Sequence, residues 1–370
     1  MLNPLKMNKL IIALAVLAMA VSSCNGNRPE NWKDGKEKAV YALIERVTPG
    51  RSGSFELRLQ DGYDGQNEFY AYSTSGNKIL LEGNTTVSLA VAYYQYLRKF
   101  CSVNLSFCGS HVELPEKLPL PYSVKGKING RFRSFFNYCS FSYTGAWWNW
   151  DDWQWTIDFL AMNGINMPLQ VTGLEGVWYN ALLKTGYTDE QARQYLCGPA
   201  YFAWQWMGNI ESFAGPLPKS WIDSHIELGK KVMQREIELG MHPIQQGFAG
   251  NVPAFFKEKY PDAHIAAKED WCGFPSVYQL DPTDPLFAEF GKTFFEEQKK
   301  LYGLHGFYAS DPFHESKPVS TDSSYLAQVA NAIMKLNKEA DPDFRYWIMQ
   351  GWTPTKGIVT AIPKDSLFFI

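Results

Sequence analysis

From Arg131 onward the sequence repeats one pattern, an apolar strand followed by a polar loop and an amphipathic helix. Strands that alternate with helices predict a parallel sheet, because a helical crossover returns the chain to the same end of the sheet. Six segments fit a strand: Phe132–Cys139, Ile165–Val171, Pro243–Ala249, Gly306–Asp311, Arg345–Gln350 and Ser366–Ile370. Helices are expected between them, at Asp152–Asn163, Thr188–Tyr195, Ser220–Leu239, Asp284–Tyr302 and Ser323–Glu339.

Two α/β folds fit this alternation, a (β/α)8 barrel of the TIM type and a doubly wound sheet. Long polar and aromatic loops follow the strands, as they do at the carboxyl-terminal face of a barrel. No Gly-rich phosphate loop follows any strand, so nothing supports the usual ligand of a doubly wound sheet. We therefore expect an α/β barrel over residues 123–370, incomplete because six of its eight strands are present.

A small α/β domain is predicted ahead of the barrel. Residues 37–46 and 85–100 have apolar side chains at helical spacing, and residues 55–59, 69–72 and 78–83 fit strands. Prolines at 115, 119 and 121 mark a linker after it. This domain and its linker are assigned residues 25–122.

Residues 1–24 have the pattern of a lipoprotein-type signal peptide. Lys6 and Lys9 precede the apolar run Leu10–Val21, which is too short for a comfortable membrane span, and small residues stand before Cys24. An ordinary secretory signal with a chance cysteine is the alternative. A lipidated Cys24 would anchor the protein to a membrane. In the bacterial group with lipoproteins of this kind, export to the cell surface needs acidic residues just after the lipidated cysteine. No acid stands between Cys24 and Glu30, so we expect the periplasmic face, with the cell surface as the alternative.

The net charge and the cysteine pattern argue against nucleic-acid binding and against a metal site. Lys and Arg total 35 against 38 Asp and Glu, a net charge of −3, so no basic field attracts nucleic acid. The five cysteines after Cys24 are widely scattered, and no CxxC or paired-His spacing indicates a metal site. We expect no nucleic acid partner and no cofactor.

The clearest chemical cluster follows the strand Gly306–Asp311. Asp311, His314 and Glu315 come where that strand ends, which in a parallel barrel is the face that carries the active site. A carboxylic acid there can protonate a glycosidic oxygen. A surface loop with polar side chains explains the spacing equally well.

Glu175 and several tryptophans also follow strands. Glu175 either belongs to a pocket or caps the next helix. Trp204, Trp271 and Trp352 are plausible walls for a sugar, because aromatic faces stack on sugar rings, whereas Trp153 has core spacing on a helix.

Several ordered blocks are shared with one family. They are Asn137–Tyr143, Trp147–Trp153, Met162–Asn166, Gly173–Trp178, Gly198–Asn209, Gly215–Pro218, Phe248–Pro253, Asp311–Glu315 and Trp347–Trp352. Together they resemble glycoside hydrolase family 89, the α-N-acetylglucosaminidases, over about residues 37–370. The family combines a small α/β domain, a (β/α)8 barrel and an all-α domain. Its members remove terminal non-reducing α-linked N-acetylglucosamine from glycans with retention of configuration.

The resemblance implies roles for individual residues. It makes Glu315 the general acid/base, with His314 standing where the family usually has Asn. It places Asn137, Cys139, Trp204, Met207, Trp271 and Trp352 at the sugar pocket, and Glu175 falls in a shared block as a pocket residue.

The resemblance also implies a missing part. A retaining glycosidase needs two carboxyl groups about 5–5.5 Å apart, and the family's nucleophile is a Glu later in the barrel than Ile370. We therefore expect a fragment that lacks the nucleophile and the α domain, and that is inactive and poorly stable alone. A non-catalytic, lipid-anchored carbohydrate-binding protein is the alternative function. Another hexosaminidase or glucuronidase barrel fits the Trp-rich blocks less well.

Overall fold

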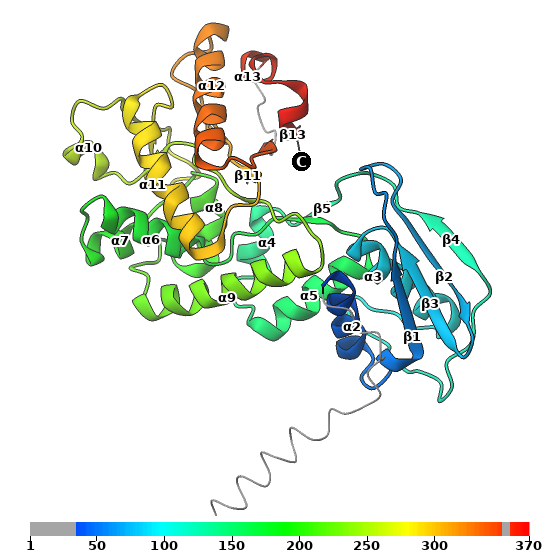
Figure 1. Ribbon diagram of the computed structural model, residues 1–370. Coiled ribbons are helices and arrows are strands. Elements are labelled where there is room, and N and C mark those ends of the chain that lie inside the picture. Colours follow the sequence, from blue (N-terminus) through cyan, green and yellow to red (C-terminus); the bar gives the residue numbers. More distant parts are fainter. Residues whose placement is uncertain (1–34, 350–355, 370) are drawn as a thin grey trace, which may run out of the picture. The chain divides into compact units, whose positions relative to one another are not determined.

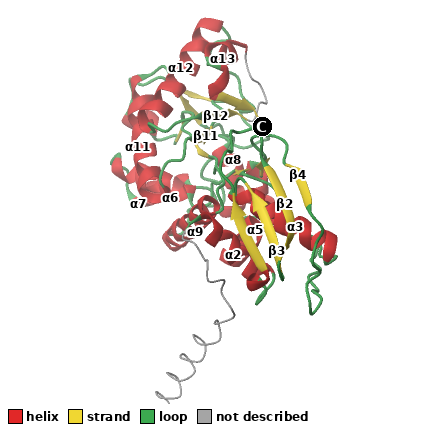
Figure 2. Ribbon diagram, turned by 45° about the vertical axis from the view of Figure 1, so that its right-hand side comes forward, coloured by secondary structure: helices red, strands yellow, loops and turns green. Residues whose placement is uncertain are grey.

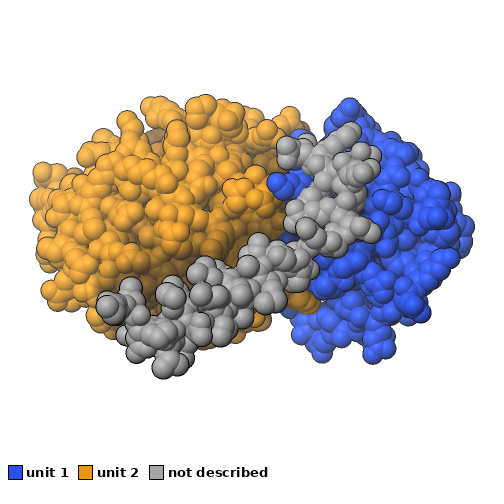
Figure 3. Space-filling view, turned by 60° about the horizontal axis from the view of Figure 1, so that its bottom comes forward, with its two compact units in different colours: residues 1–131, 161–164 blue, residues 132–160, 165–370 orange. Residues whose placement is uncertain are grey.

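The computed structural model describes residues 35–349 and 356–369. Cys24 and Trp352, for which the sequence predicts lipidation and sugar binding, lie outside the described residues. The chain forms two compact units (Figure 3). One runs to Arg131 and includes Ala161–Gly164, and the other comprises Phe132–Leu160 and Ile165–Ile370. Over the described residues, no helix is both long and apolar enough to span a bilayer.

The first unit is a four-stranded sheet with two helices (Figures 1 and 2). The strand order is β1 (Phe55–Leu59), β3 (Lys78–Gly83), β2 (Phe69–Ser75) and β4 (Val124–Lys127), with only the β1–β3 pair parallel. The helices are α2 (Lys36–Val47) and α3 (Thr86–Phe100), and a 3-10 turn, η1 (Ser52–Ser54), precedes β1. Every element expected in this unit is present.

Helix α3 forms and packs for clear reasons. Thr85 and Ser88 make a capping box, in which each side chain accepts from the other residue's backbone N–H. The helix places Tyr93 and Tyr96 edge-on against Phe55 of β1, with ring centroids 5.3 and 5.8 Å apart. Such aromatic contacts bury large apolar areas at favourable geometry, so α3 and the sheet form the core of this unit.

The predicted domain boundary after residue 122 needs correction. Strand β4 pairs with β2 through Ala71 and Lys125, so residues 124–127 belong to the small unit and the second unit begins at Phe132. The sequence Val-Lys-Gly-Lys has one apolar residue and lies at the sheet edge, where a strand needs no alternating pattern.

The second unit contains six parallel strands in sequence order. They are β5 (Ser134–Phe135), β6 (Met167–Pro168), β7 (Gln245–Gln246), β11 (Phe307–Ala309), β12 (Tyr346–Met349) and β13 (Leu367–Phe369). β5 pairs with β6, and β7, β11, β12 and β13 form a second run. The parallel bridge Leu169–Ile244 joins the two runs. All six predicted strands are confirmed, and among the described residues no pairing closes β13 onto β5.

Helices follow the strands (Figure 1). The longer ones are α5 (Trp150–Met162), α6 (Leu174–Lys184), α7 (Asp189–Tyr195), α9 (Lys219–Glu238), α11 (Pro285–Tyr302) and α12 (Ser323–Ala340). The shorter ones are α4 (Tyr138–Tyr143), η2 (Pro199–Tyr201), α8 (Phe202–Trp206), α10 (Phe256–Lys259), α13 (Lys356–Ala361) and η3 (Lys364–Ser366). A small antiparallel sheet of β8 (Asn251–Val252), β10 (Tyr278–Leu280) and β9 (Ile265–Ala267) lies between β7 and α11 in the sequence.

The first predicted strand ends earlier than expected. Tyr138 and Cys139 belong to helix α4, because Asn137 is its N-cap and the Asn137 side chain accepts from the Ser140 amide at 3.0 Å. The predicted helix at 284–302 is confirmed with Asp284 as its cap, which accepts from the Leu286 amide at 2.9 Å.

Candidate active site

The loop after β11 presents a strained glutamate. Glu315 has φ +45°, in the left-handed region that costs a non-glycine residue free energy. The two preceding side chains, Phe313 and His314, are buried and anchor the loop, whereas the Glu315 side chain is 30% exposed. The loop therefore holds a carboxyl group at the carboxyl end of a barrel strand, in reach of solvent.

Two neutral donors converge on one oxygen of that carboxyl group. Oε2 of Glu315 accepts from Trp271 Nε1 at 2.6 Å and from Asn209 Nδ2 at 3.1 Å. The Nε2 atom of His314 lies 3.8 Å from the same oxygen. These donors fix the orientation of the carboxyl group.

Asn209 reaches Glu315 from the end of α8. Gly208 adopts φ +76°, and the Asn209 amide donates to the Trp204 carbonyl at 2.8 Å, which ends the helix. Asn209 is 4% exposed. The sequence pattern alone does not distinguish Asn209 within the block Gly198–Asn209. Its place after the strand-end tryptophans is the one indication that the sequence offers.

The predicted aromatic walls meet beside this carboxyl group. Trp271 lies in the turn after β9, where the Phe274 amide donates to the Trp271 carbonyl at 2.8 Å. Its ring centroid is 6.5 Å from that of Trp204, which lies 5.4 Å from the ring of Tyr143. Tyr143 is 75% exposed. The three rings form a surface suited to stacking on a sugar.

The other predicted site residues differ in their burial and in the groups they contact. Cys139 on α4 is close enough to interact electrostatically with Glu315; burial, first, and then the negative Glu315 raise the pKa of its thiol. Met207 is buried at the end of α8. Asn137 is exposed and uses its side-chain oxygen to cap α4.

His314 is a neutral side chain in this setting. Burial lowers the pKa of its imidazole, the negative Glu315 opposes that shift, and the cation of Lys268 adds to it. A neutral imidazole 3.8 Å from Glu315 Oε2 adds no full positive charge to the site.

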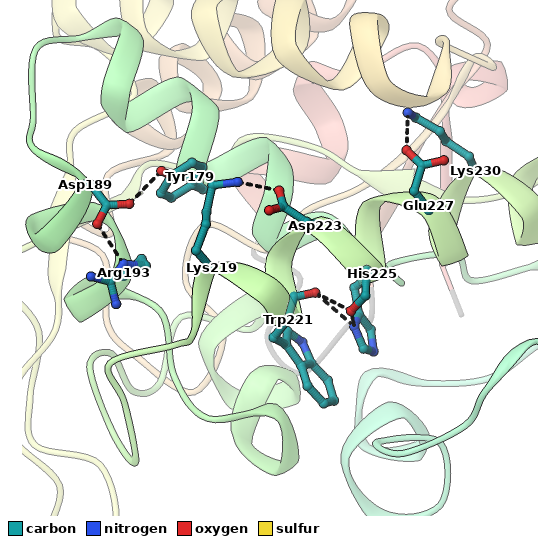
Figure 4. A network of polar contacts seen from close by, with 10 residues as sticks. Tyr179, Asp189, Arg193, Lys219, Trp221, Asp223, His225, Glu227 and Lys230 are labelled. Carbon is teal, nitrogen blue, oxygen red and sulfur yellow. Dashed lines mark hydrogen bonds and ion pairs between the residues drawn. The ribbon is translucent and has the colours of Figure 1, made fainter.

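Glu175 occupies a different environment. It is 2% exposed in the first turn of α6, and burial raises the pKa of its carboxyl to about 7. It accepts from Trp221 Nε1 at 3.1 Å. Trp221 and His225 lie one turn apart on α9, as Figure 4 shows, and their rings stack with centroids 3.8 Å apart. Glu175 also lines a small hollow with Trp148, Trp206 and Trp221, and among the described residues no hydrogen bond or ion pair joins it to Glu315.

A metal would need several ligands together, and the described part of the chain has no group of three or more His, Cys, Asp or Glu able to hold one. The arrangement is a polarised carboxyl group at a strand end beside aromatic rings. Such an arrangement is typical of the carboxyl-terminal face of a (β/α) barrel, where active sites form.

Comparisons with known proteins specify the family. The profile of the "Alpha-N-acetylglucosaminidase (NAGLU) tim-barrel domain" matches residues 133–364, and that of the corresponding N-terminal domain matches residues 38–120. The human alpha-N-acetylglucosaminidase is 31% identical over 384 aligned residues. The chain therefore belongs to the α-N-acetylglucosaminidase family. The alignment covers 98% of this chain and 51% of the human protein, so the chain spans about half the length of that relative.

Solved structures agree with this assignment. A family 89 glycoside hydrolase from Clostridium perfringens, in complex with 2-acetamido-1,2-dideoxynojirmycin, superposes with a TM-score of 0.85 at 32% identity. The match covers 90% of this chain and 39% of that enzyme. A variant of the same enzyme with two Glu-to-Gln substitutions was solved with its substrate, GlcNAc-alpha-1,4-galactose. A family 20 exo beta-N-acetylglucosaminidase from Vibrio harveyi shares only the fold, with a TM-score of 0.51 at 12% identity.

Proposed function

We propose that the protein containing this chain is a retaining exo-glycosidase that hydrolyses terminal α-linked N-acetylglucosamine, with Glu315 as its general acid/base. The observation that carries this proposal is the paired donation from Trp271 and Asn209 to Glu315 Oε2. Family membership and the likeness to an enzyme solved with GlcNAc-alpha-1,4-galactose support the substrate class.

The two donors assign separate roles to the two oxygens of Glu315. Oε2 accepts two N–H groups, so the acid proton is expected on Oε1, from which it passes to the glycosidic oxygen as the bond breaks. The donors then stabilise the carboxylate that remains. In the second step the same carboxylate takes a proton from the attacking water.

The remaining parts of the mechanism come from the aromatic surface and a second carboxylate. Trp204, Trp271 and Tyr143 can stack on the apolar face of the sugar. The nucleophile is expected, from the family resemblance, in the barrel region that follows β13. Glu175 is a poor candidate because its carboxyl group is buried against Trp221.

The test is Glu315→Gln, made in the protein that the complete gene encodes. An amide keeps the shape of the acid but has no proton to give, so hydrolysis of an unactivated disaccharide should fall at least ~100-fold. Formation of the glycosyl-enzyme from a nitrophenyl glycoside should suffer less, because its leaving group needs less protonation. Glu269→Gln is the control, since Glu269 is 71% exposed and pairs with Lys317. Parental activity in the Glu315 variant would refute the proposal, and sugar binding without turnover in the parent would favour a carbohydrate-binding protein.

We also propose a location, which is independent of the chemistry. The Val-Ser-Ser-Cys sequence before and at Cys24 supports lipid attachment and tethering at the periplasmic face. Replacing Cys24 by Ala should release the protein or leave its signal uncleaved. A Cys24→Ala protein that is still cleaved, acylated and membrane-bound would contradict this proposal.

A further inference from the structure

We infer that Lys268 is a positioning residue that ties together the two chain segments whose side chains donate to Glu315. This inference rests on the proposed function of Glu315. Among the described residues, Lys268 makes no hydrogen bond to Glu315 itself, and it acts through the residues that do.

The contacts of Lys268 are short and directed inward. Its Nζ donates to Asn251 Oδ1 at 2.6 Å and to the Gly208 carbonyl at 3.2 Å. Part of the side chain is exposed, but the ammonium group is enclosed by protein, and this burial lowers its pKa to about 7. An enclosed ammonium group costs free energy unless its hydrogen bonds are kept.

The first segment tied by Lys268 carries Asn209. Gly208, whose carbonyl Lys268 holds, directly precedes it and adopts φ +76°. Asn251 packs so closely on Gly208 that an added Cβ would lie 2.4 Å from Asn251 Oδ1. Lys268, Asn251 and Gly208 thus form one packed unit, and Asn209 leaves it toward Glu315.

The second segment carries Trp271. Lys268 itself lies three residues before Trp271, and its backbone amide donates to the Val277 carbonyl at 2.8 Å across the hairpin. The turn that follows is closed between Trp271 and Phe274. A displacement of Lys268 would therefore move the indole donor and the amide donor relative to each other.

Packing alone does not fix this region. A hollow of about 290 Å³ is lined by Lys268, Gln279, Phe313 and Ser316, among others. Because the loop that carries Glu315 borders open space on this side, directed hydrogen bonds contribute more to its geometry than close packing does.

The test is Lys268→Met in the protein that the complete gene encodes. Deleting a direct donor in an active site costs ~10²–10³-fold in kcat, so an indirect tie should cost roughly tenfold to hundredfold, with a smaller change in KM. An unactivated disaccharide should lose more rate than a nitrophenyl glycoside. Lys268→Gln, whose amide keeps a hydrogen-bond donor, should recover part of the rate.

The matched control is Lys317→Met, which removes an exposed cation from the same neighbourhood. It should leave kcat and the ratio of disaccharide to nitrophenyl glycoside rates unchanged. If Lys268→Met keeps the parental thermal midpoint and behaves like this control, the inference is wrong. If Lys268→Met does not fold, the same comparison on Lys268→Gln decides, and a parental kcat with a parental rate ratio overturns the inference. Loss of activity in Glu315→Gln alone would leave the proposed function intact, whereas activity in both Glu315→Gln and Lys268→Met would overturn the proposed function as well.

Discussion

At the scale of single residues, the site depends on side chains whose roles differ between near neighbours. Trp204 and Trp206 stand two positions apart on α8. Trp204 is partly exposed beside Trp271, whereas Trp206 is 5% exposed and stacks on Phe202 at 5.1 Å. We therefore propose that the first binds sugar and that the second stabilises the fold.

This difference predicts a contrasting pair of variants. Trp204→Ala should weaken the binding of 2-acetamido-1,2-dideoxynojirmycin, a ligand of the Clostridium perfringens relative, with little loss of stability. Trp206→Ala should cost ~3–5 kcal/mol of stability. Calorimetric titration and urea unfolding measure the two effects. A large stability loss with unchanged affinity in Trp204→Ala would assign Trp204 to the core.

Glu175 gives the fold a pH dependence. Its carboxyl pKa is raised by burial from an ordinary 4.5 to about 7, so the folded protein holds a proton that the unfolded chain releases. The free energy of unfolding is therefore highest below pH 4.5 for this group alone, and falls as the pH rises to about 7.

Glu175→Gln should remove this dependence, because a neutral Gln oxygen can still accept from Trp221. Relative to the parent, the variant should gain stability as the pH rises from 5 to 8, by up to about 3 kcal/mol at ~1.4 kcal/mol per pKa unit. Urea unfolding across this range measures the gain. Parallel stability curves for the two proteins would show that Glu175 does not titrate as described.

At the scale of elements, regular periodicity made the long helices and the strands predictable. Asp284 before Pro285 marks the start of α11, and the burial of Phe287, Phe290 and Phe294 follows its helical spacing. Helix α6 was not predicted, because it is buried on nearly all sides and its apolar residues lack a period. The predicted first strand extended into helix α4, since only the Asn137 cap marks the change.

Gly208 connects α8 to the site, and its substitution tests that connection. In Gly208→Ala, the alanine would have to adopt a left-handed backbone conformation, and its Cβ would lie 2.4 Å from Asn251. We expect Gly208→Ala to cause a marked loss of kcat and a smaller loss of stability, because Asn209 must shift. Gly76→Ala is the control, since Gly76 has φ +58° and open space around its Cα. Equal kcat in the two variants would mean that this turn does not position Asn209.

At the scale of the whole molecule, the sequence pointed to Glu315 as a candidate but not to the residues that hold its carboxyl group. Glu315, Trp204 and Trp271 follow recognisable strands or lie in family blocks. Asn209 and Lys268 join the site only through tertiary hydrogen bonds across α8, β8 and the β9–β10 hairpin, which no local pattern specifies. The two units were likewise predictable, and only the edge strand β4 shifted their boundary.

The most direct test of Glu315 as the general acid/base uses Glu315→Ala in the protein that the complete gene encodes, with a nitrophenyl α-N-acetylglucosaminide and added azide. Without the general base, water attacks the glycosyl-enzyme only slowly, whereas azide attacks it without needing proton removal. Azide should accelerate turnover, and the product should be the azide of retained, α configuration. Turnover unaffected by azide, or a product of β configuration, would contradict the assignment of Glu315 as the general acid/base.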